Sequence, residues 1–150
     1  MNFPPDFREF LQLLDAHGVE YVITGGYAVA YHGVPRFTGD LDVYVRPSPD
    51  NAARLVRVID EFGFGSADLT PADFTAEGQT VQLGIPPLRI DLVMKLDGVS
   101  ADDVFARKIR DEDRGVSVWF ISREDLVRNK KTMNRPRDVA DLENFPGDSA

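Results

Sequence analysis

The spacing of apolar residues predicts helices and strands that alternate along the chain. Phe7, Phe10, Leu11 and Leu14 share one face of a helix, which would end at Gly18. By the same criteria, strands are expected at residues 21–24, 41–45, 81–85, 88–94 and 116–121. Further helices are expected at residues 25–31, 49–62 and 136–144, with two more starting after Ser100 and Ser122.

This order of elements predicts the fold class. It is α-β-α-β-α-β-β-α-β-α-α, interrupted by a polar loop at residues 65–79. Such an order is typical of a mixed α+β or α/β domain, in which helices flank a small twisted mixed sheet. The 150 residues suit a single domain, residues 1–150, whose residues 122–145 form a C-terminal helical part.

Composition narrows the classes of protein to consider. The chain has no cysteine, which excludes a disulfide framework, a zinc–thiolate site and a thiol nucleophile. Apolar runs fall short of the roughly 20 residues that cross a bilayer. The N-terminal residues also lack the basic start and apolar stretch of a signal peptide. We therefore expect a cytoplasmic protein that does not enter a membrane.

Charge is distributed unevenly along the chain. The net charge of −8 disfavours general binding to phosphate backbones. Residues 123–137 nevertheless contain six basic residues and only two acidic ones. The basic residues are Arg123, Arg128, Lys130, Lys131, Arg135 and Arg137. This segment is either a solvated helix face or a local wall that binds phosphate.

Three aspartates carry the strongest chemical signal. Asp40 and Asp42 flank the start of a predicted strand and point to one face, because side chains alternate along a strand. Two carboxylates on one face repel unless a cation lies between them, and Mg²⁺ prefers such oxygen ligands. Asp91 is a lone acid in the apolar strand at residues 88–94. If the two strands pair, all three acids can bind one or two Mg²⁺ ions and activate a hydroxyl.

The pair Gly25-Gly26 lies where a predicted strand becomes a helix. Glycine lets the backbone approach a ligand closely, and amide groups at a helix start can bind phosphate. The alternative is a tight turn that only allows the helix to pack on the strand. The pattern is neither a Rossmann fingerprint nor a P-loop.

Together these motifs resemble the polymerase-β-type nucleotidyltransferase superfamily. The resemblance rests on Gly25-Gly26, then Asp40-x-Asp42, then the separate Asp91, and it extends over about residues 18–145. A narrower resemblance is to small bacterial nucleotidyltransferases related to abortive-infection and toxin–antitoxin proteins. Its motifs are Gly26-Tyr27-Ala28-Val29, His32-Gly33, Arg36-x-Thr38-x-Asp40-x-Asp42 and Lys130 through Arg137-Asp138-x-x-Asp141-Leu142.

The resemblance implies a set of site residues. Asp40 and Asp42 would bind Mg²⁺, Asp91 would complete the catalytic site, and Lys130 would contact the triphosphate. Gly25, Gly26, Arg36 and Thr38 would belong to the nucleotide site. Several residues keep an alternative role: Arg36 as an ion-pair partner of Asp40, Lys130 as a solvated side chain and His32 as a structural histidine. The usual Gly-Ser is Gly-Gly in this chain, so a serine contact to phosphate would be missing.

The implied activity is Mg²⁺-dependent transfer of an NMP from an NTP to a hydroxyl of RNA or of a protein, within a toxin–antitoxin system or outside one. The partners would then be an NTP, the acceptor and a cognate toxin or antitoxin protein. Two alternatives remain open. The chain could be an antitoxin-like binding module, or an inactive nucleotidyltransferase that acts by binding a partner protein.

Overall fold

The computed structural model describes residues 1–34, 37–65, 68–75, 79–85 and 87–145. The described strands form one mixed sheet in the order β3-β4-β2-β1-β6-β5. They are β1 (Tyr21–Thr24), β2 (Leu41–Val45), β3 (Val81–Leu83), β4 (Ile90–Val93), β5 (Ile109–Asp113) and β6 (Val116–Phe120). This arrangement confirms the predicted mixed α/β architecture.

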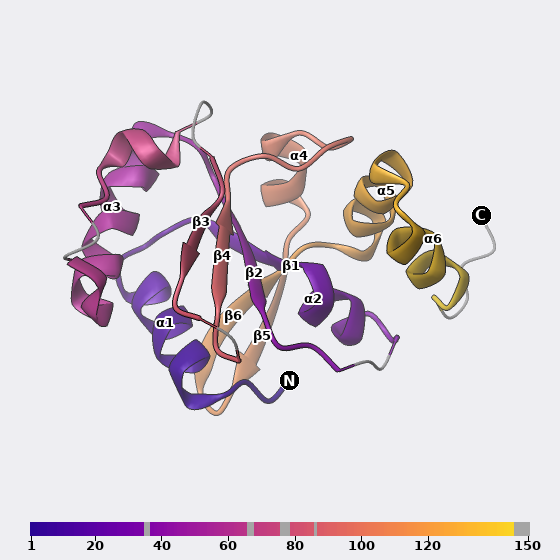
Figure 1. The fold of residues 1–150 in the computed structure, drawn as a ribbon, viewed down its shortest axis with the longest axis horizontal. Helices are drawn as coiled ribbons and strands as arrows, with labels where there is room; N and C mark the ends of the chain where they lie inside the picture. The colour runs from indigo at the N-terminus through magenta and orange to yellow at the C-terminus, as the bar shows by residue number, and fades with distance from the viewer. Residues whose placement is uncertain (35–36, 66–67, 76–78, 86, 146–150) are drawn as a thin grey trace.

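Helices lie on both sides of the sheet. They are α1 (Pro5–Ala16), α2 (Gly25–Tyr31), α3 (Pro49–Ile59), α4 (Ala101–Ala106), α5 (Arg123–Met133) and α6 (Pro136–Glu143). In Figure 1, α1 and α3 lie to the left of the central strands, and α2, α5 and α6 lie to the right. None of the described helices has the length and apolarity required to span a membrane.

Local sequence explains where these helices begin and which face they bury. The apolar stripe of α1 is fully buried, as its spacing predicts, with Phe10 and Leu14 at 0% exposure. Serine side chains cap α3 and α5: the Asn51 amide donates to Ser48 Oγ at 3.3 Å, and the Asp125 amide donates to Ser122 Oγ at 3.1 Å. Each cap satisfies an amide at a helix start that has no partner within the helix.

The middle of the sheet sets up the site. Strand β2 lies between β1, which is antiparallel to it, and β4, which is parallel to it. The register places Asp42 opposite Thr24 of β1 and opposite Asp91 of β4. The strands that carry the aspartates therefore pair, which is the condition under which the sequence places all three acids together.

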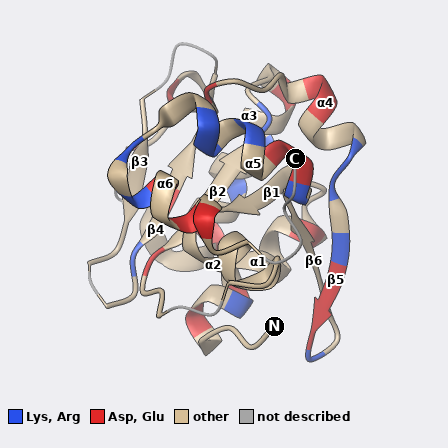
Figure 2. Cartoon of the chain, turned by 90° about the vertical axis from the view of Figure 1, so that its right-hand side faces the viewer, with Lys and Arg blue, Asp and Glu red and all other residues tan. Residues whose placement is uncertain are grey.

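The structure corrects the prediction in three segments. Strand β5 was not expected, because Ile109–Asp113 is highly charged, as the blue and red along this strand in Figure 2 show. As an edge strand paired only with β6, it buries little besides Asp113. The helix predicted to reach residue 62 changes at Ile59 into a π-helical segment, Asp60–Phe64. The loop predicted at residues 65–79 contains a short 3₁₀ helix, Pro71–Phe74.

Candidate active site

Four charged side chains share one face of β2 and β4. Asp42 lies opposite Asp91, and Leu41 lies opposite Ile90. The Leu41 amide also donates a hydrogen bond to the Arg89 carbonyl at 3.0 Å, which continues the pairing to Asp40 and Arg89. Since side chains alternate along each strand, Asp40 and Asp42 project on the same side as Arg89 and Asp91. We call these four residues the charged quartet.

Arg89 joins two of the carboxylates in the quartet. Its Nη2 donates to Asp40 Oδ2 at 2.8 Å and to Asp91 Oδ2 at 3.1 Å. Its Nε lies 3.0 Å from Asp91 Oδ1, but neither of these two buried atoms makes a well-oriented hydrogen bond within the described residues. The guanidinium therefore neutralises part of the cluster while leaving one Asp91 oxygen poorly satisfied.

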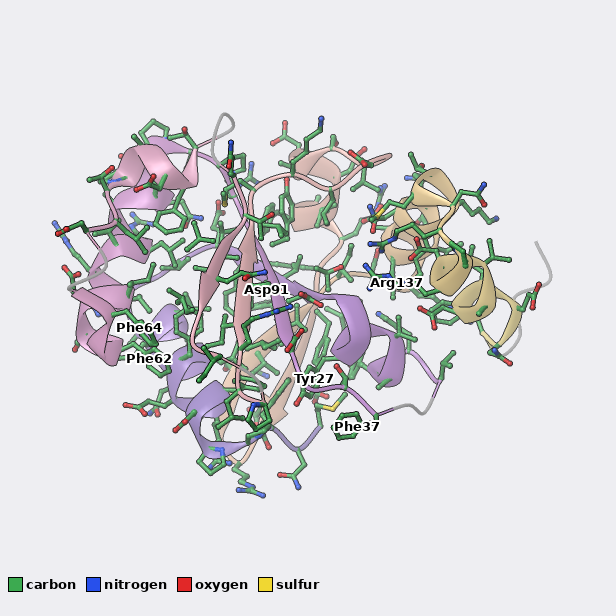
Figure 3. The ribbon with its side chains drawn as sticks, in the orientation of Figure 1. Tyr27, Phe37, Phe62, Phe64, Asp91 and Arg137 are labelled. Atoms are coloured by element: carbon green, nitrogen blue, oxygen red, sulfur yellow. The ribbon has the colours of Figure 1, made fainter. Side chains whose placement is uncertain are left out.

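Unlike Asp40 and Asp91, Asp42 has no ion-pair partner among the described residues. Burial, followed by the neighbouring charges of Asp91 and Asp40, raises its pKa to about 7, and Arg137 opposes this increase. Of these causes, the repulsion from Asp91 and Asp40 would be relieved by a cation bound beside the carboxylates. Figure 3 shows Asp91 near the centre of the molecule and Arg137 on the side of the C-terminal helices that faces the sheet.

Gly25 lies directly against Asp42. Its φ of +64° is in the left-handed region that favours glycine, and a Cβ atom there would lie 2.0 Å from Asp42 Oδ2. The first residue of α2 must therefore lack a side chain for the Asp42 carboxylate to occupy its place. This contact gives one half of the Gly25-Gly26 motif a steric reason that is independent of any ligand.

Two cavities meet at Asp42. The first, here called the acid cavity, has a volume of about 310 Å³ and contains the charged quartet together with Gly26, Phe37 and Thr38. The second, here called the helix-side cavity, has a volume of about 260 Å³ and is lined by Val93, Leu96, Leu126 and Met133, among others. Gly25, Asp42, Lys130, Arg135 and Arg137 line both. One cavity is thus mainly polar, and the other has apolar walls.

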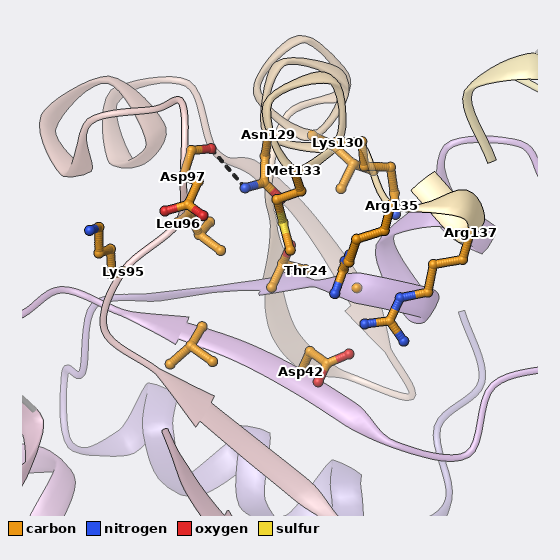
Figure 4. A pocket seen from close by; sticks show the side chains of 13 residues that line it. Thr24, Asp42, Lys95, Leu96, Asp97, Asn129, Lys130, Met133, Arg135 and Arg137 are labelled. Atoms are coloured by element: carbon orange, nitrogen blue, oxygen red, sulfur yellow. Dashed lines mark hydrogen bonds between the residues drawn. The ribbon is translucent and has the colours of Figure 1, made fainter. Parts of the chain in front are cut away.

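The basic residues of segment 123–137 lie in different surroundings. Arg135 and Arg137 point toward Asp42 from above (Figure 4), and Arg137 forms no ion pair within the described part of the chain. Arg128 instead pairs with Glu124 at 3.1 Å, and Lys131 is exposed. Only part of the predicted wall therefore faces the cavities.

Lys130 is held by two aspartates of α6. Its Nζ lies 3.2 Å from Asp138 Oδ1 and 3.0 Å from Asp141 Oδ2, and only 7% of its side chain is exposed. Burial alone would raise the pKa of Asp138, but hydrogen bonds from Arg135 and Lys130 outweigh it and lower that pKa to about 2. The network fixes α6 against α5 and so positions Arg137.

Lys130→Met should lower the free energy of unfolding by about 2–3 kcal/mol, because it leaves buried carboxylates short of a partner while keeping the aliphatic length. Urea denaturation measures this loss. The neighbouring exposed substitution Lys131→Met is the matched control and should change the free energy by less than about 0.5 kcal/mol. Equal effects of the two substitutions would contradict the buried network.

The remaining predicted residues lie as follows. Gly26 and Thr38 line the acid cavity, and Thr38 Oγ1 lies 3.4 Å from the Asp40 carbonyl, to which it donates. Arg36 lies outside the described residues. His32 Nε2 is 2.7 Å from the Ile121 carbonyl, which is a structural contact. Gly25, Gly26, Thr38, Lys130 and the three aspartates are therefore brought together around one pair of cavities.

Comparison with known proteins identifies the family. A family model described as "Nucleotidyltransferase of unknown function (DUF6036)" matches residues 2–145. The chain belongs to this nucleotidyltransferase family. The superfamily resemblance seen in the motifs is thereby confirmed.

Solved structures support the same fold. A candidate nucleotidyltransferase from Thermotoga maritima is 17% identical with a TM-score of 0.61, over 93% of this chain and 89% of that one. An antigenic nucleotidyltransferase-like protein from Paracoccidioides brasiliensis is 15% identical with a TM-score of 0.54, over 92% of this chain and 71% of that one. No curated protein matches the chain. At these identities the two structures establish the fold of the nucleotidyltransferase domain and nothing finer.

The candidate site is not a complete metal-binding centre as it stands. Among the described residues, no three acidic or histidine side chains are gathered to hold a metal ion as they stand. Asp42 and Asp91 nevertheless fit a hard cation, since they are paired in register and Asp91 Oδ1 is buried without a hydrogen bond from a described residue. Arg89 forms ion pairs with both Asp40 and Asp91.

Arg89 was not predicted to belong to the candidate site, and Arg137 was not distinguished from the other residues of the basic segment. The signal for Arg89 was present: it lies two residues before Asp91 and so shares its face of the strand. Arg137 could not be distinguished, because the orientation of α6 depends on tertiary contacts.

Proposed function

We propose that this nucleotidyltransferase moves an NMP from an NTP to a hydroxyl group of RNA or of a protein. The proposal rests on Asp42 and Asp91, which lie opposite each other on paired strands. Asp42 lines both the polar acid cavity and the helix-side cavity with its apolar walls. Nucleotides combine a polyanion with an apolar base, and so a site for them needs both environments side by side.

The catalytic roles follow from the charged quartet. Asp42, Asp91 and Asp40 would hold Mg²⁺, as one or two ions. When bound, Mg²⁺ supplies positive charge to the phosphates and lowers the pKa of an attacking hydroxyl. Asp91 accepts the acceptor's hydroxyl proton. The hydroxyl oxygen bonds to the α-phosphorus, the bond from that phosphorus to the β-phosphate bridge oxygen breaks, and pyrophosphate leaves with the electron pair.

Substrate binding is divided between the two cavities. We propose that the triphosphate binds in the acid cavity beside Gly25, Gly26 and Thr38. Arg36, which lies outside the described residues, keeps its proposed role in nucleotide binding. Lys130 and Arg137, which line this cavity, are the cationic side chains that we assign to the triphosphate oxygens. The nucleoside then extends into the helix-side cavity against Leu126 and Met133. Because α2 has only seven residues, this assignment rests on the cavities and not on a helix dipole.

The acceptor approaches from the side of Phe37. This side chain lines the acid cavity and is 91% exposed, which is unusual for an aromatic residue. An exposed ring beside the acids can stack on an RNA base or pack against a protein acceptor. A protein acceptor would agree with the proposed place in a cytoplasmic toxin–antitoxin pair.

Labelled NTP tests the proposal directly. The protein is incubated with each α-³²P-labelled NTP, Mg²⁺ and either total RNA or cell lysate, and label should appear in one RNA or protein band. EDTA should abolish the labelling. Binding of NTP with Mg²⁺, seen as a higher melting temperature without any labelled product, would favour the binding-module alternative. Absence of both binding and labelling would contradict the proposed function.

A further inference from the structure

Arg89 occupies the position between two of the proposed metal ligands. It contacts Asp40 and Asp91 at 2.8–3.1 Å through the same Nη2 atom. Among the described residues, no other cation forms an ion pair with either of these carboxylates. A divalent ion that used both Asp40 and Asp91 would have to displace this guanidinium.

Net charge differs between the two halves of the charged quartet. Its earlier half, Asp40 with Arg89, is neutral as a pair, whereas its later half, Asp42 with Asp91, contains two acids in register. A cation is therefore attracted first to the later half, where repulsion is greatest. There it meets Asp91, which is already engaged by Arg89.

Arg89 cannot move as a whole residue. Its carbonyl accepts the Leu41 amide at 3.0 Å, which fixes its backbone at the start of the paired strands. Its guanidinium is less constrained, because the side chain is 28% exposed and Nε has no well-oriented hydrogen bond among the described residues. The side chain can therefore leave Asp40 and Asp91 by rotation, toward the acid cavity that it lines.

We propose that Arg89 is a built-in counter-ion that holds Asp40 and Asp91 together and competes with the divalent cation for them. In the absence of metal it stabilises the cluster of acids. When the cation binds, Arg89 is released into the acid cavity, where a triphosphate oxygen is its next partner. This role for a positioning residue rests on the proposed function, because it assumes that the aspartates bind a divalent cation.

Metal binding without nucleotide tests the competition. Free Mn²⁺ is measured by electron paramagnetic resonance at pH 8 for the wild type, Arg89→Gln and Arg110→Gln. Arg110 is the control, because it pairs with Glu112 on β5, at the opposite edge of the sheet. Arg89→Gln should lower the Kd for Mn²⁺ about ten-fold or more, since it removes a competing charge. Arg110→Gln should leave the Kd unchanged.

Other outcomes distinguish this role from a structural one. An ion pair with only a structural role would lower the melting temperature of Arg89→Gln in EDTA without tightening Mn²⁺ binding, and an unchanged or weaker affinity overturns the inference. If neither the wild type nor Arg89→Gln binds Mn²⁺, the proposed cation site fails and this inference fails with it. If Mn²⁺ binds equally to both, only this inference fails.

A measurement on the wild type remains if Arg89→Gln does not fold. In protein labelled with ¹⁵N-arginine, the Nε signal of Arg89 should shift during Mg²⁺ titration. The midpoint should equal the Kd for Mg²⁺ that is obtained when Mg²⁺ displaces bound Mn²⁺ in the electron paramagnetic resonance measurement. Arg89→Lys assigns the signal by its disappearance. An Nε signal that is unaffected at saturating Mg²⁺ overturns the competition.

Discussion

Asp42→Asn is expected to reduce nucleotidyl transfer on the order of 1,000-fold, the largest loss from one substitution in this site. Asp42 lies at the junction of both cavities, and its carboxylate is opposite Asp91 in the sheet. Asparagine has nearly the same shape but cannot supply the negative charge that holds a hard cation. The initial rate of label transfer from α-³²P-labelled NTP measures the loss.

The same substitution should stabilise the metal-free fold, and the effect has a definite dependence on pH. The folded-state pKa of Asp42 is raised to about 7 from an ordinary value of 3.8. The stability linked to its protonation is therefore fully present below pH 3.8 and lost as pH rises through about 7. In EDTA, Asp42→Asn should melt above the wild type at pH 8, by a margin that shrinks at pH 5.

Asp102→Asn provides the matched control for both measurements. Asp102 has a 93% exposed side chain and pairs with Arg46, away from the two cavities. Asp102→Asn removes the same charge as Asp42→Asn, so any effect of net charge alone would appear in both variants. Retention of transfer by Asp42→Asn would be incompatible with the role assigned to this carboxylate, even if the change in melting temperature were as expected.

The shared face of the aspartates was predictable because strand periodicity is a local property. Asp40 and Asp42 share a face whatever the strand pairs with, and an acid such as Asp91 is conspicuous in an apolar strand. The pairing of β2 with β4 is not local. It depends on which strands the intervening α3 segment brings together, and this is visible only in the fold.

Other features lay beyond the sequence for distinct physical reasons. Strand β5 is stabilised by its ladder with β6 and not by burial, so its charged residues show no apolar alternation. Lys130 and Lys131 are adjacent and chemically identical, yet one is buried between two aspartates and the other is exposed. Their difference arises from how α6 packs on α5, which composition does not reveal.

Gly25→Ala is expected to lower transfer by about 100-fold, because a displacement of about 1 Å at a reacting group costs roughly that factor. The added Cβ would lie 2.0 Å from Asp42 Oδ2 and 2.8 Å from Asp42 Cγ, so the carboxylate must leave its place opposite Asp91. The residue also has a φ of +64°, which costs alanine about 1–2 kcal/mol. Transfer rate and urea denaturation are measured together.

Gly115→Ala separates the two causes. Gly115 has a φ of +85°, but a Cβ there would have no described heavy atom within 4 Å. Both variants therefore carry the backbone cost, whereas only Gly25→Ala displaces Asp42. A stability loss of about 1–2 kcal/mol with full transfer is expected for Gly115→Ala. If Gly25→Ala behaved in the same way, the contact between the glycine and Asp42 would have no part in the reaction, and the motif would serve only the turn into α2.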